Sequence, residues 1–316
     1  MHNPLISILI PSYNAGQWIA ETLEASLAQT WRHTEIIVVD DGSTDETIEV
    51  VKTFESRGVK LIVQQNRGAS AARNAAFRAS AGEFIQFLDA DDIISPDKIR
   101  CQLRRLLQQQ NAVAICPWGR FYDNPAHVRL DPSASWQDLP PVDWLVATWS
   151  LGGGMLFPAM WLVPRRVINR AGLWREDLSL NDDGEFFTRV VLASDHVLFC
   201  QEGTAYYRSG IPGSLSGTRS ERGFKSGFEA IRASIENTRA VEDSNRVRRC
   251  GALLWQVYAH GAYPHCRELA SDALRNARVL HDVKLSPVGG LAFCALSNVL
   301  GWKVARRLQE WLRKPS

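Results

Sequence analysis

The chain has 316 residues, of which 45% are hydrophobic and 22% charged, and its formal net charge is +2. A chain of this length and apolar content can bury a large core. The near balance of charge gives no reason to expect nucleic-acid binding through bulk electrostatics, so no nucleic-acid partner is predicted. The six cysteines show no C-x-x-C spacing, which favours buried thiols in a reducing cytoplasm.

Short apolar runs and segments of helical spacing alternate through the first third of the chain. The runs predict strands at Leu5–Ile10, Glu35–Val39, Lys60–Val63, Glu83–Leu88 and Ala112–Cys116. Helices are expected up to about Gln29, after a cap at Ser43 or Thr44, over Ala69–Ala79, and from Pro96 to about Gln110. This alternation predicts an α/β fold with a mostly parallel central sheet covered by helices.

The remainder of the chain is less regular at first and then helical. Residues 123–143 are irregular, and Gly152-Gly153-Gly154 predicts a hinge or a loop that approaches other backbone closely. A strand and short helix are expected over Leu162–Leu173, a helix over Asp182–Leu192 and a strand over Val197–Tyr207. Residues from Phe224 onward predict a helical C-terminal extension.

Polar residues follow four of the expected strands, at 12–14, 40–41, 64–66 and 89–92. Ligands bind beyond the carboxyl ends of the strands in such sheets, so we expect the site at this edge. Asp89-Ala90-Asp91 offers two carboxylates at a strand end, which are hard oxygen ligands for Mg²⁺ or Mn²⁺. The alternative is ordinary solvated turn chemistry.

Two further features lie at the same expected edge. Asp40 and Asp41 can form a turn and a helix cap, but adjacent carboxylates repel, which favours a second role in accepting hydrogen bonds from a base or ribose. Arg73 projects from the 69–79 helix and is able to pair with phosphate or stack on a base. A solvated surface arginine is the expectation for Arg67 and Arg78 instead.

These motifs together resemble the family-2 glycosyltransferases, which have the GT-A nucleotide-sugar-binding fold. The resemblance is carried by residues 8–14 (ILIPSYN), 37–43 (IVVDDGS), Gly68 with 72–74 (ARN), and 82–92 (GEFIQFLDADD). It implies a transferase domain over residues 1–220, with a nucleotide-binding half at about 1–117 and an acceptor half at about 118–220. Residues 221–316 would be the helical extension.

The resemblance also implies roles for individual residues. The nucleotide-sugar site would comprise Pro11 and Tyr13 at the base, Asp41 at the base or ribose, Asn66 and Arg73 beside the nucleotide, Asp89 at ribose or metal, and Ala90. Asp91 would ligate the metal together with Asp89. Arg208 and the following 213–216 segment resemble, more loosely, a segment that folds over the diphosphate; a surface arginine is the alternative.

The family's catalytic base lies in an acidic pair before a helix, which maps to Asp183 with Asp182 as its neighbour. Family members more often have Glu-Asp here, so the choice between the two acids stays open. Helix capping is the alternative role, because acids are favoured at helix starts. Trp118 and Trp161 are candidates for stacking on sugar rings, although most tryptophans are expected in the core.

We therefore expect a metal-dependent, inverting glycosyltransferase that moves a sugar from a nucleotide-sugar, such as a UDP-sugar, to a saccharide or lipid-linked acceptor. Surface polysaccharide or glycoconjugate synthesis is the expected context. A sugar nucleotidyltransferase is one alternative, but it would carry a Gly-rich basic loop where Pro11-Ser-Tyr-Asn14 stands. A non-catalytic binding subunit is the other, and the retained acids argue against it.

The C-terminal residues predict a contact with a membrane surface. Residues 288–300 are apolar but too short to span a bilayer, and Val304, Leu308 and Trp311 share one helical face. The accompanying basic residues are Lys303, Arg306, Arg307, Arg313 and Lys314. The alternative is a terminal helix packed on the domain. We expect a cytoplasmic protein, either soluble or peripheral on the inner membrane face.

Overall fold

The computed structural model describes residues 3–211, 220–281, 287 and 289–312. Within these residues a central seven-stranded sheet runs in the order β10-β6-β9-β4-β1-β2-β3. The strands are β1 (Ile6–Ser12), β2 (Thr34–Asp40), β3 (Val59–Val63), β4 (Phe84–Phe87), β6 (Val113–Ile115), β9 (Trp161–Pro164) and β10 (Val197–Phe199). Only β9 runs antiparallel to its neighbours in this described sheet, which confirms the predicted α/β fold.

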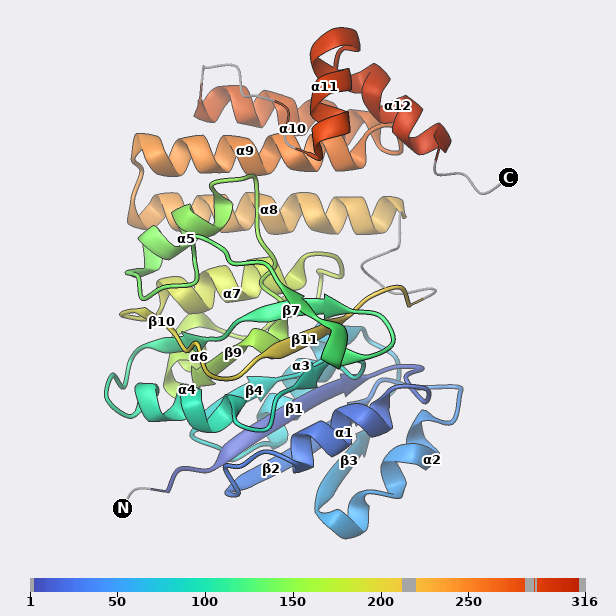
Figure 1. The fold of residues 1–316 in the computed structure, drawn as a ribbon, viewed down its shortest axis with the longest axis vertical. Coiled ribbons are helices and arrows are strands. Elements are labelled where there is room, and N and C mark those ends of the chain that lie inside the picture. The colour runs from blue at the N-terminus through green and yellow to red at the C-terminus, as the bar shows by residue number, and fades with distance from the viewer. Residues whose placement is uncertain (1–2, 212–219, 282–286, 288, 313–316) are drawn as a thin grey trace.

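Helices connect these strands and cover the sheet (Figure 1). They are α1 (Ile19–Leu27), α2 (Thr47–Lys52), α3 (Ala69–Ala79), α4 (Lys98–Leu106), α6 (Arg165–Ala171) and α7 (Asp182–Leu192). Helix α3 packs on β1 and β2, and its fully buried Ala72 and Ala76 have small side chains that let the helix approach the sheet closely. This close approach positions the amino-terminal half of α3 beside the strand ends.

The strand register brings the expected polar segments to one edge. Ser12 lies opposite Asp40 and Asp40 lies opposite Val63, so β1, β2 and β3 end level with one another. On the other side of β1, Leu9 lies opposite Phe87 of β4. The residues that follow these four parallel strands therefore share the carboxyl edge of the sheet, as the sequence predicts.

A second sheet corrects the expectation of one strand over Val197–Tyr207. That segment forms β10 in the central sheet and then β11 (Ala205–Arg208), which pairs in the order β5-β11-β7-β8 with β5 (Ile93–Ile94), β7 (Trp118–Phe121) and β8 (Arg129–Leu130). The chain turns between them at Gly203, whose φ is 101°. The region 123–143, expected to be irregular, also begins helix α5 (Pro141–Trp149).

The remaining described helices are α8 (Glu221–Val241), α9 (Asn245–Ala262), α10 (Arg267–Leu280), α11 (Leu291–Leu300) and α12 (Trp302–Leu312). Figure 1 shows α8, α9 and α10 stacked above α7, with α11 and α12 at the far end from the N-terminus. The hydrophobic core continues into this stack through Ile235, Leu254 and Trp255. In the described part of the chain, no helix combines the length and the apolar character that crossing a membrane requires.

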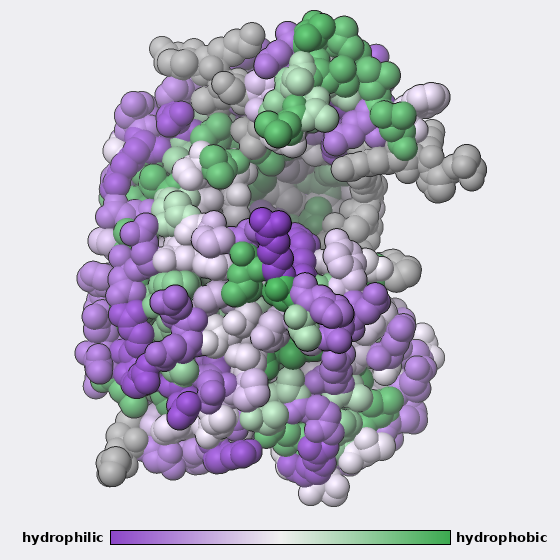
Figure 2. Space-filling model, viewed as in Figure 1, coloured by the Kyte–Doolittle hydropathy of each residue, from purple (hydrophilic) through white to green (hydrophobic). Residues whose placement is uncertain are grey.

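Helices α11 and α12 expose a group of apolar side chains, which we call the C-terminal apolar patch. It comprises Leu291, Val299, Leu300, Val304, Leu308, Trp311 and Leu312. Figure 2 shows apolar residues gathered at this end of the molecule. Helix α12 is anchored from its other side, because the Trp302 ring lies 4.5 Å from the His260 ring and 5.3 Å from the Tyr263 ring.

Candidate functional site

The loops that follow β1 and β2 are joined by their side chains. Asn14, at φ 48°, accepts a hydrogen bond at 2.8 Å from the backbone N–H of Thr44. The Ser43 hydroxyl accepts one from the N–H of Asn14 at 2.9 Å, and the Thr47 hydroxyl accepts one from the N–H of Ala15 at 2.8 Å. Ser43 and Thr44, expected as helix caps, therefore hold the two loops together, and α2 begins at Thr47.

Three of the predicted nucleotide-binding residues lie at this edge with different exposure. Pro11 is buried in β1, whereas Tyr13, just beyond the strand, is 52% exposed. Asn66 is exposed in the loop between β3 and α3. Tyr13 and Asn66 are therefore accessible to a ligand, and the roles of all three residues stay predictions.

Asp40 and Asp41 are both buried and both accept several hydrogen bonds. Asp40 accepts from the N–H of Gly42 at 3.1 Å and of Ser43 at 2.8 Å, which closes the turn after β2. Asp41 accepts from the N–H of Arg67 and of Gly68, the latter at 2.7 Å, where α3 begins.

The Asp41 carboxylate also accepts a 2.7 Å hydrogen bond from the Gln64 side chain. Three donors thus satisfy the Asp41 carboxylate, because the single N–H of Arg67 is shared between both oxygens. A negative charge at this point also suits the positive end of the α3 dipole. A contact between Asp41 and the base or ribose stays a prediction, and it would have to share oxygens that already accept backbone donors.

Arg73 joins two acidic motifs, at 89–92 and 182–183, that lie about 90 residues apart in the sequence. Its guanidinium donates to Asp89 at 2.7 Å and to Asp182 at 2.8 Å, and the Ser70 hydroxyl donates to the same oxygen of Asp182. The guanidinium also lies 4.4 Å from the centre of the Trp174 ring. Arg73 is only 5% exposed, so this is an interior link between the end of β4 and the start of α7.

The acidic turn, residues 89–92, is held from α1. The Thr22 hydroxyl donates to the backbone carbonyls of Ala90 and Asp92, both at 2.9 Å. The turn also closes on itself, because the N–H of Asp92 donates to the carbonyl of Asp89 at 3.1 Å. These contacts fix the backbone of the turn. They do not involve the carboxylates of its acidic side chains.

Arg208 of β11 contacts the same turn from the second sheet. Its backbone N–H donates to Asp92 at 3.0 Å, and its side chain donates to the backbone carbonyl of Asp91 at 2.8 Å and contacts Glu21. The side chain is 7% exposed and lies 4.4 Å from the centre of the Phe121 ring. Arg208 is therefore buried, and the alternative of an exposed surface arginine is wrong. The 213–216 segment that was expected to accompany it lies outside the described residues.

The acidic turn carries more negative charge than its neighbours compensate. Burial, with the charge of Asp89, raises the pKa of Asp91 to about 6. Burial and the charges of Asp91 and Asp89 raise the pKa of Asp92 well above its ordinary value, and one Asp92 carboxylate oxygen has no hydrogen-bond partner. Uncompensated hard oxygen donors fit a divalent cation.

The protein ligands for such a cation would be few. Among the residues that the structure describes, no group of three or more His, Cys, Asp or Glu side chains is arranged to hold a metal ion. A Mg²⁺-type site commonly uses one or two carboxylates and completes its coordination with water and substrate phosphates. Asp89 and Asp91 suit that kind of open site.

The two acids at the start of α7 differ in what surrounds them. Asp182 is occupied by Arg73 and Ser70 and also accepts a 3.0 Å hydrogen bond from the N–H of Asp183. Asp183 accepts a 2.7 Å hydrogen bond from the N–H of Gly184. Burial and the charge of Asp182 raise the pKa of Asp183 to about 7. A carboxyl with this pKa can exchange a proton near neutral pH.

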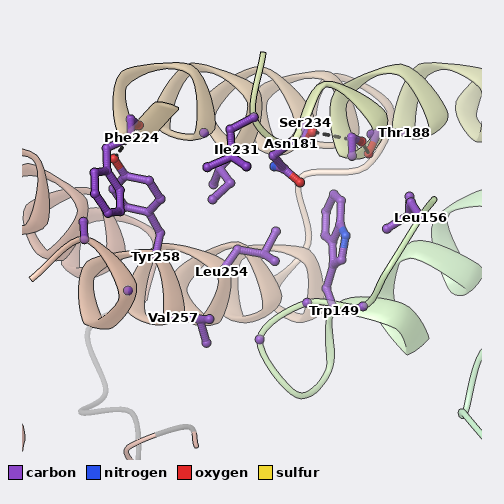
Figure 3. Close-up of a pocket in the computed structure, with 18 residues that line it drawn as sticks. Trp149, Leu156, Asn181, Thr188, Phe224, Ile231, Ser234, Leu254, Val257 and Tyr258 are labelled. Carbon is purple, nitrogen blue, oxygen red and sulfur yellow. Dashed lines mark hydrogen bonds between the residues drawn. The ribbon is translucent and has the colours of Figure 1, made fainter. Parts of the chain in front are cut away.

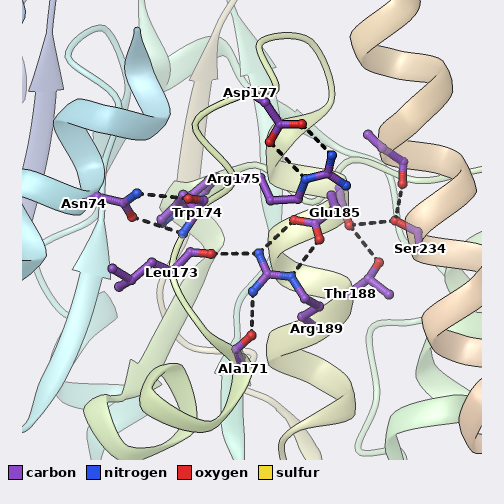
Figure 4. Close-up of polar contacts among 12 residues, drawn as sticks. Asn74, Ala171, Leu173, Trp174, Arg175, Asp177, Glu185, Thr188, Arg189 and Ser234 are labelled. Atoms are coloured by element: carbon purple, nitrogen blue, oxygen red, sulfur yellow. Dashed lines mark hydrogen bonds and ion pairs between the residues drawn. The ribbon is translucent and has the colours of Figure 1, made fainter. Parts of the chain in front are cut away.

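The segment before α7 is held by Asn74, which the resemblance included without a role, and by Glu185 and Arg189, which were not predicted (Figure 4). Asn74 donates to the carbonyl of Trp174 at 2.9 Å and accepts from its N–H at 3.0 Å. Arg189 pairs with the buried Glu185 at 2.7 Å and donates to the backbone carbonyl of Leu173 at 2.9 Å. The four-residue spacing of Glu185 and Arg189 was the available sequence signal.

One expected sugar contact is wrong. Trp161 is 1% exposed, stacks on Phe187 with ring centres 4.7 Å apart and packs against Trp144, so it belongs to the core. Its position in the central strand β9, covered on both faces, accounts for this burial. Trp118 is half-buried at the start of β7, and its role stays a prediction.

Comparison with known proteins identifies related sequences. The profile described as glycosyl transferase family 2 matches residues 7–171. The glycosyltransferase YibD of Escherichia coli K12 is 34% identical over 137 residues, which are 43% of this chain and 38% of YibD. TuaG of Bacillus subtilis 168, by name a candidate teichuronic acid biosynthesis glycosyltransferase, is 38% identical over 35% of this chain and 46% of its own. The matches thus span less than half the length of these two relatives.

Solved structures share the fold at low sequence identity. Staphylococcus aureus TarS 1-349, crystallised with UDP-GlcNAc, has a TM-score of 0.73 at 16% identity, over 98% of this chain and 91% of that one. The mannosyltransferase PcManGT of Pyrobaculum calidifontis, in complex with GDP-Man and Mn²⁺, has a TM-score of 0.56 at 17% identity, over 99% and 89%. These likenesses bear out the GT-A fold.

Proposed function

Because the chain belongs to glycosyl transferase family 2, we propose that it transfers a sugar from a nucleotide-sugar donor to a hydroxyl group of a saccharide or lipid-linked acceptor. The observation that carries this proposal is the link through Arg73, which brings the acidic turn next to the acid pair of α7. The link lies at the carboxyl edge of the sheet, where ligands of such folds bind. A donor and a base can therefore meet there.

We assign the donor site to the residues along this edge. They are Pro11, Tyr13, Asp41, Asn66, Arg73, Asp89, Ala90 and Arg208. A UDP-sugar is the proposed donor class, supported by the UDP-GlcNAc in TarS, and a GDP-sugar is the class to test beside it because of PcManGT. The name of TuaG supports a product that is a surface polysaccharide or glycoconjugate.

A divalent cation, Mn²⁺ or Mg²⁺, is the proposed cofactor, with Asp91 and Asp89 as its protein ligands. When bound, it would neutralise charge on the departing nucleotide diphosphate. The uncompensated charge of the acidic turn supports this assignment. Thr22 and Arg208 would contribute by fixing the backbone that carries these carboxylates.

Asp183 is the proposed catalytic base. Its carboxylate would take the proton of the acceptor hydroxyl as the acceptor oxygen bonds to the anomeric carbon and the bond to the phosphate oxygen breaks. A pKa of about 7 suits a base that works at neutral pH. A single displacement of this kind inverts the anomeric centre. Asp182, occupied by Arg73, would orient the start of α7.

The experiment that tests this function is a screen of UDP- and GDP-sugars with the full chain and Mn²⁺ or Mg²⁺. We expect slow release of the nucleoside diphosphate from one donor through hydrolysis, and faster release when an acceptor is added. Release of pyrophosphate instead would favour a sugar nucleotidyltransferase. Donor binding without turnover, with every acceptor class tried, would favour a non-catalytic binding subunit.

We also propose that the C-terminal apolar patch contacts an anionic membrane surface. Its Trp311 is 71% exposed and Leu312 is 74% exposed, and the exposed cations Lys303 and Arg307 lie on the same helix. Tryptophan beside basic residues suits the headgroup layer, where each basic residue contributes about 1 kcal/mol. Arg313 and Lys314, named with them in the sequence analysis, lie outside the described residues.

Co-sedimentation with anionic and zwitterionic vesicles tests this contact. The double variant Trp311→Ser, Leu312→Ser should lose binding to anionic vesicles at low salt. Val279→Ser is the matched control, because Val279 of α10 is 82% exposed outside the patch. Equal recovery of all three proteins would reject the membrane contact and leave the transferase proposal untouched.

A further inference from the structure

A cavity of about 250 Å³ lies between the loop after α5, the start of α7, and helices α8 and α9. Figure 3 shows the Trp149 ring and the Asn181 side chain directed into the space between the two long helices. Most of the labelled wall is apolar, with Leu156, Ile231 and Leu254 among its side chains. The proposed donor residues do not contribute to this wall.

All three side-chain hydroxyl groups in this wall have partners in the protein. The Tyr258 hydroxyl donates to the carbonyl of Phe224 at 2.7 Å, and the Ser234 hydroxyl donates to its own helix at 2.8 Å. The Thr188 hydroxyl donates to the carbonyl of Gly184 at 2.7 Å. A sugar ring needs several free donors and acceptors, so this wall suits an apolar group better.

Several glycines line the cavity. At two of them, a larger side chain would not clash with the neighbouring helices. Six of the eighteen lining residues are Gly152, Gly153, Gly154, Gly184, Gly227 and Gly261. A Cβ on Gly261 would meet no atom within 4 Å, and one on Gly227 would lie 3.5 Å from the nearest atom. Both lie in helices, where glycine is less stable than alanine. The empty space is therefore not forced by close packing of the helices.

The cavity adjoins the proposed catalytic base in the chain. Asn181 and Gly184 line it, and these residues bracket the acid pair of α7. We propose that the cavity binds an apolar group of the acceptor, carried close to the hydroxyl that reacts. The acceptor would then be an amphiphile, with an aromatic ring or a stretch of alkyl chain next to its nucleophilic hydroxyl. This inference deepens the proposed function and rests on it.

The size of the cavity agrees with such a group. An engineered apolar cavity of about 150 Å³ binds benzene, so a cavity of about 250 Å³ can take a ring or several methylene groups. Each buried methylene raises affinity by about fourfold. An alkyl chain that enters the cavity should therefore bind measurably even without its natural head group.

The test is calorimetric binding of octyl and methyl β-D-glucopyranoside, below the micelle concentration of the former, to the full chain. We expect about tenfold or greater preference for the octyl compound, as burial of two or more methylenes requires. Gly261→Leu and Gly227→Leu, which fill the cavity from two different helices, should remove that preference while keeping the melting temperature. Ala240→Leu adds the same side chain at an exposed position of α8, and this control should keep the preference for the octyl compound.

Absence of octyl preference in the unmodified chain, or its survival in both filled variants, would overturn the inference. Uptake of octyl chains by the C-terminal apolar patch would be the same in all variants, so it cannot imitate the expected pattern. Donor hydrolysis is measured separately and needs no acceptor. Hydrolysis without octyl preference rejects the cavity inference alone. Octyl preference without release of nucleoside diphosphate from any donor rejects the transferase proposal, and with it the assignment of the bound group to an acceptor, while the cavity stays an apolar binding site.

Discussion

Two acidic segments lie at the carboxyl ends of strands β2 and β4 of the central sheet. Their carboxylates differ in how many hydrogen-bond donors surround them. The carboxylates of Asp40 and Asp41 accept hydrogen bonds from backbone N–H groups of two loops. Desolvation and mutual repulsion raise the pKa values of Asp91 and Asp92, and one oxygen of the buried Asp92 has no partner. Both segments look alike as Asp-rich strand ends in the sequence.

The difference shows that two carboxylate pairs with similar sequences can have different electrostatic surroundings. What matters is whether the protein itself compensates their charge. Backbone N–H donors satisfy the carboxylates of Asp40 and Asp41, which makes them part of the scaffold. The carboxylates of Asp91 and Asp92 have too few donors, so a bound cation would stabilise their negative charge. Substitutions in the two segments should therefore fail in different ways.

The largest expected effect is on turnover in Asp91→Asn. Loss of a ligand removes several kcal/mol of transition-state stabilisation, which corresponds to about a thousandfold or more in rate. The melting temperature should not fall, because the substitution removes a partly desolvated charge that repels Asp89. Nucleoside diphosphate release against Mn²⁺ concentration is the measurement. Full activity of this variant in chelator-treated, metal-free buffer would disprove the metal assignment.

Asp183→Asn should lower transfer by about a hundredfold or more, the usual contribution of a general base. Donor affinity should stay nearly normal, because the proposed donor residues are unchanged. Single-turnover rates and donor titration separate the two quantities. A normal rate in Asp183→Asn, with Asp182→Asn inactive, would move the base one residue upstream.

The transfer rate should also depend on pH in a direction set by Asp183. Burial raises its pKa to about 7, so the carboxyl is protonated and inactive as a base below that pH. The rate should fall about tenfold for each pH unit below 7 and level off above it. A pH profile of kcat at saturating metal measures this. A flat profile between pH 5 and 8 would contradict the assignment.

The smallest expected effect is in Asp41→Asn, and it concerns stability. The new amide would direct N–H groups at the N–H groups of Arg67 and Gly68. The free energy of unfolding should fall by about 2 kcal/mol, the cost of leaving buried donors unpaired. Urea denaturation measures the change, with Asp91→Asn as the unaffected counterpart. Unchanged stability with lost donor binding would assign Asp41 to the nucleotide instead.

Much of the sheet and its edge follows from local pattern. The apolar runs predict the parallel strands, and the predicted bounds of α3 and α7 agree with the structure because helical spacing is a local pattern. The burial of Arg73 could not be predicted from local sequence patterns, because its partner Asp182 lies 109 residues away. The division of residues 197–207 between two sheets depends on the same kind of distant pairing, with β7 and β6.

The contacts around the acidic turn have a consequence for how the protein is made. Thr22 reaches Ala90 across 68 residues, and Arg208 reaches Asp92 across 116. Pairings this distant slow folding, because the entropy cost of closing a long loop comes before the stabilising contacts form. On the ribosome, Asp92 cannot acquire its Arg208 partner until β11 has emerged, so the turn should mature well after β1 to β4 have been synthesised.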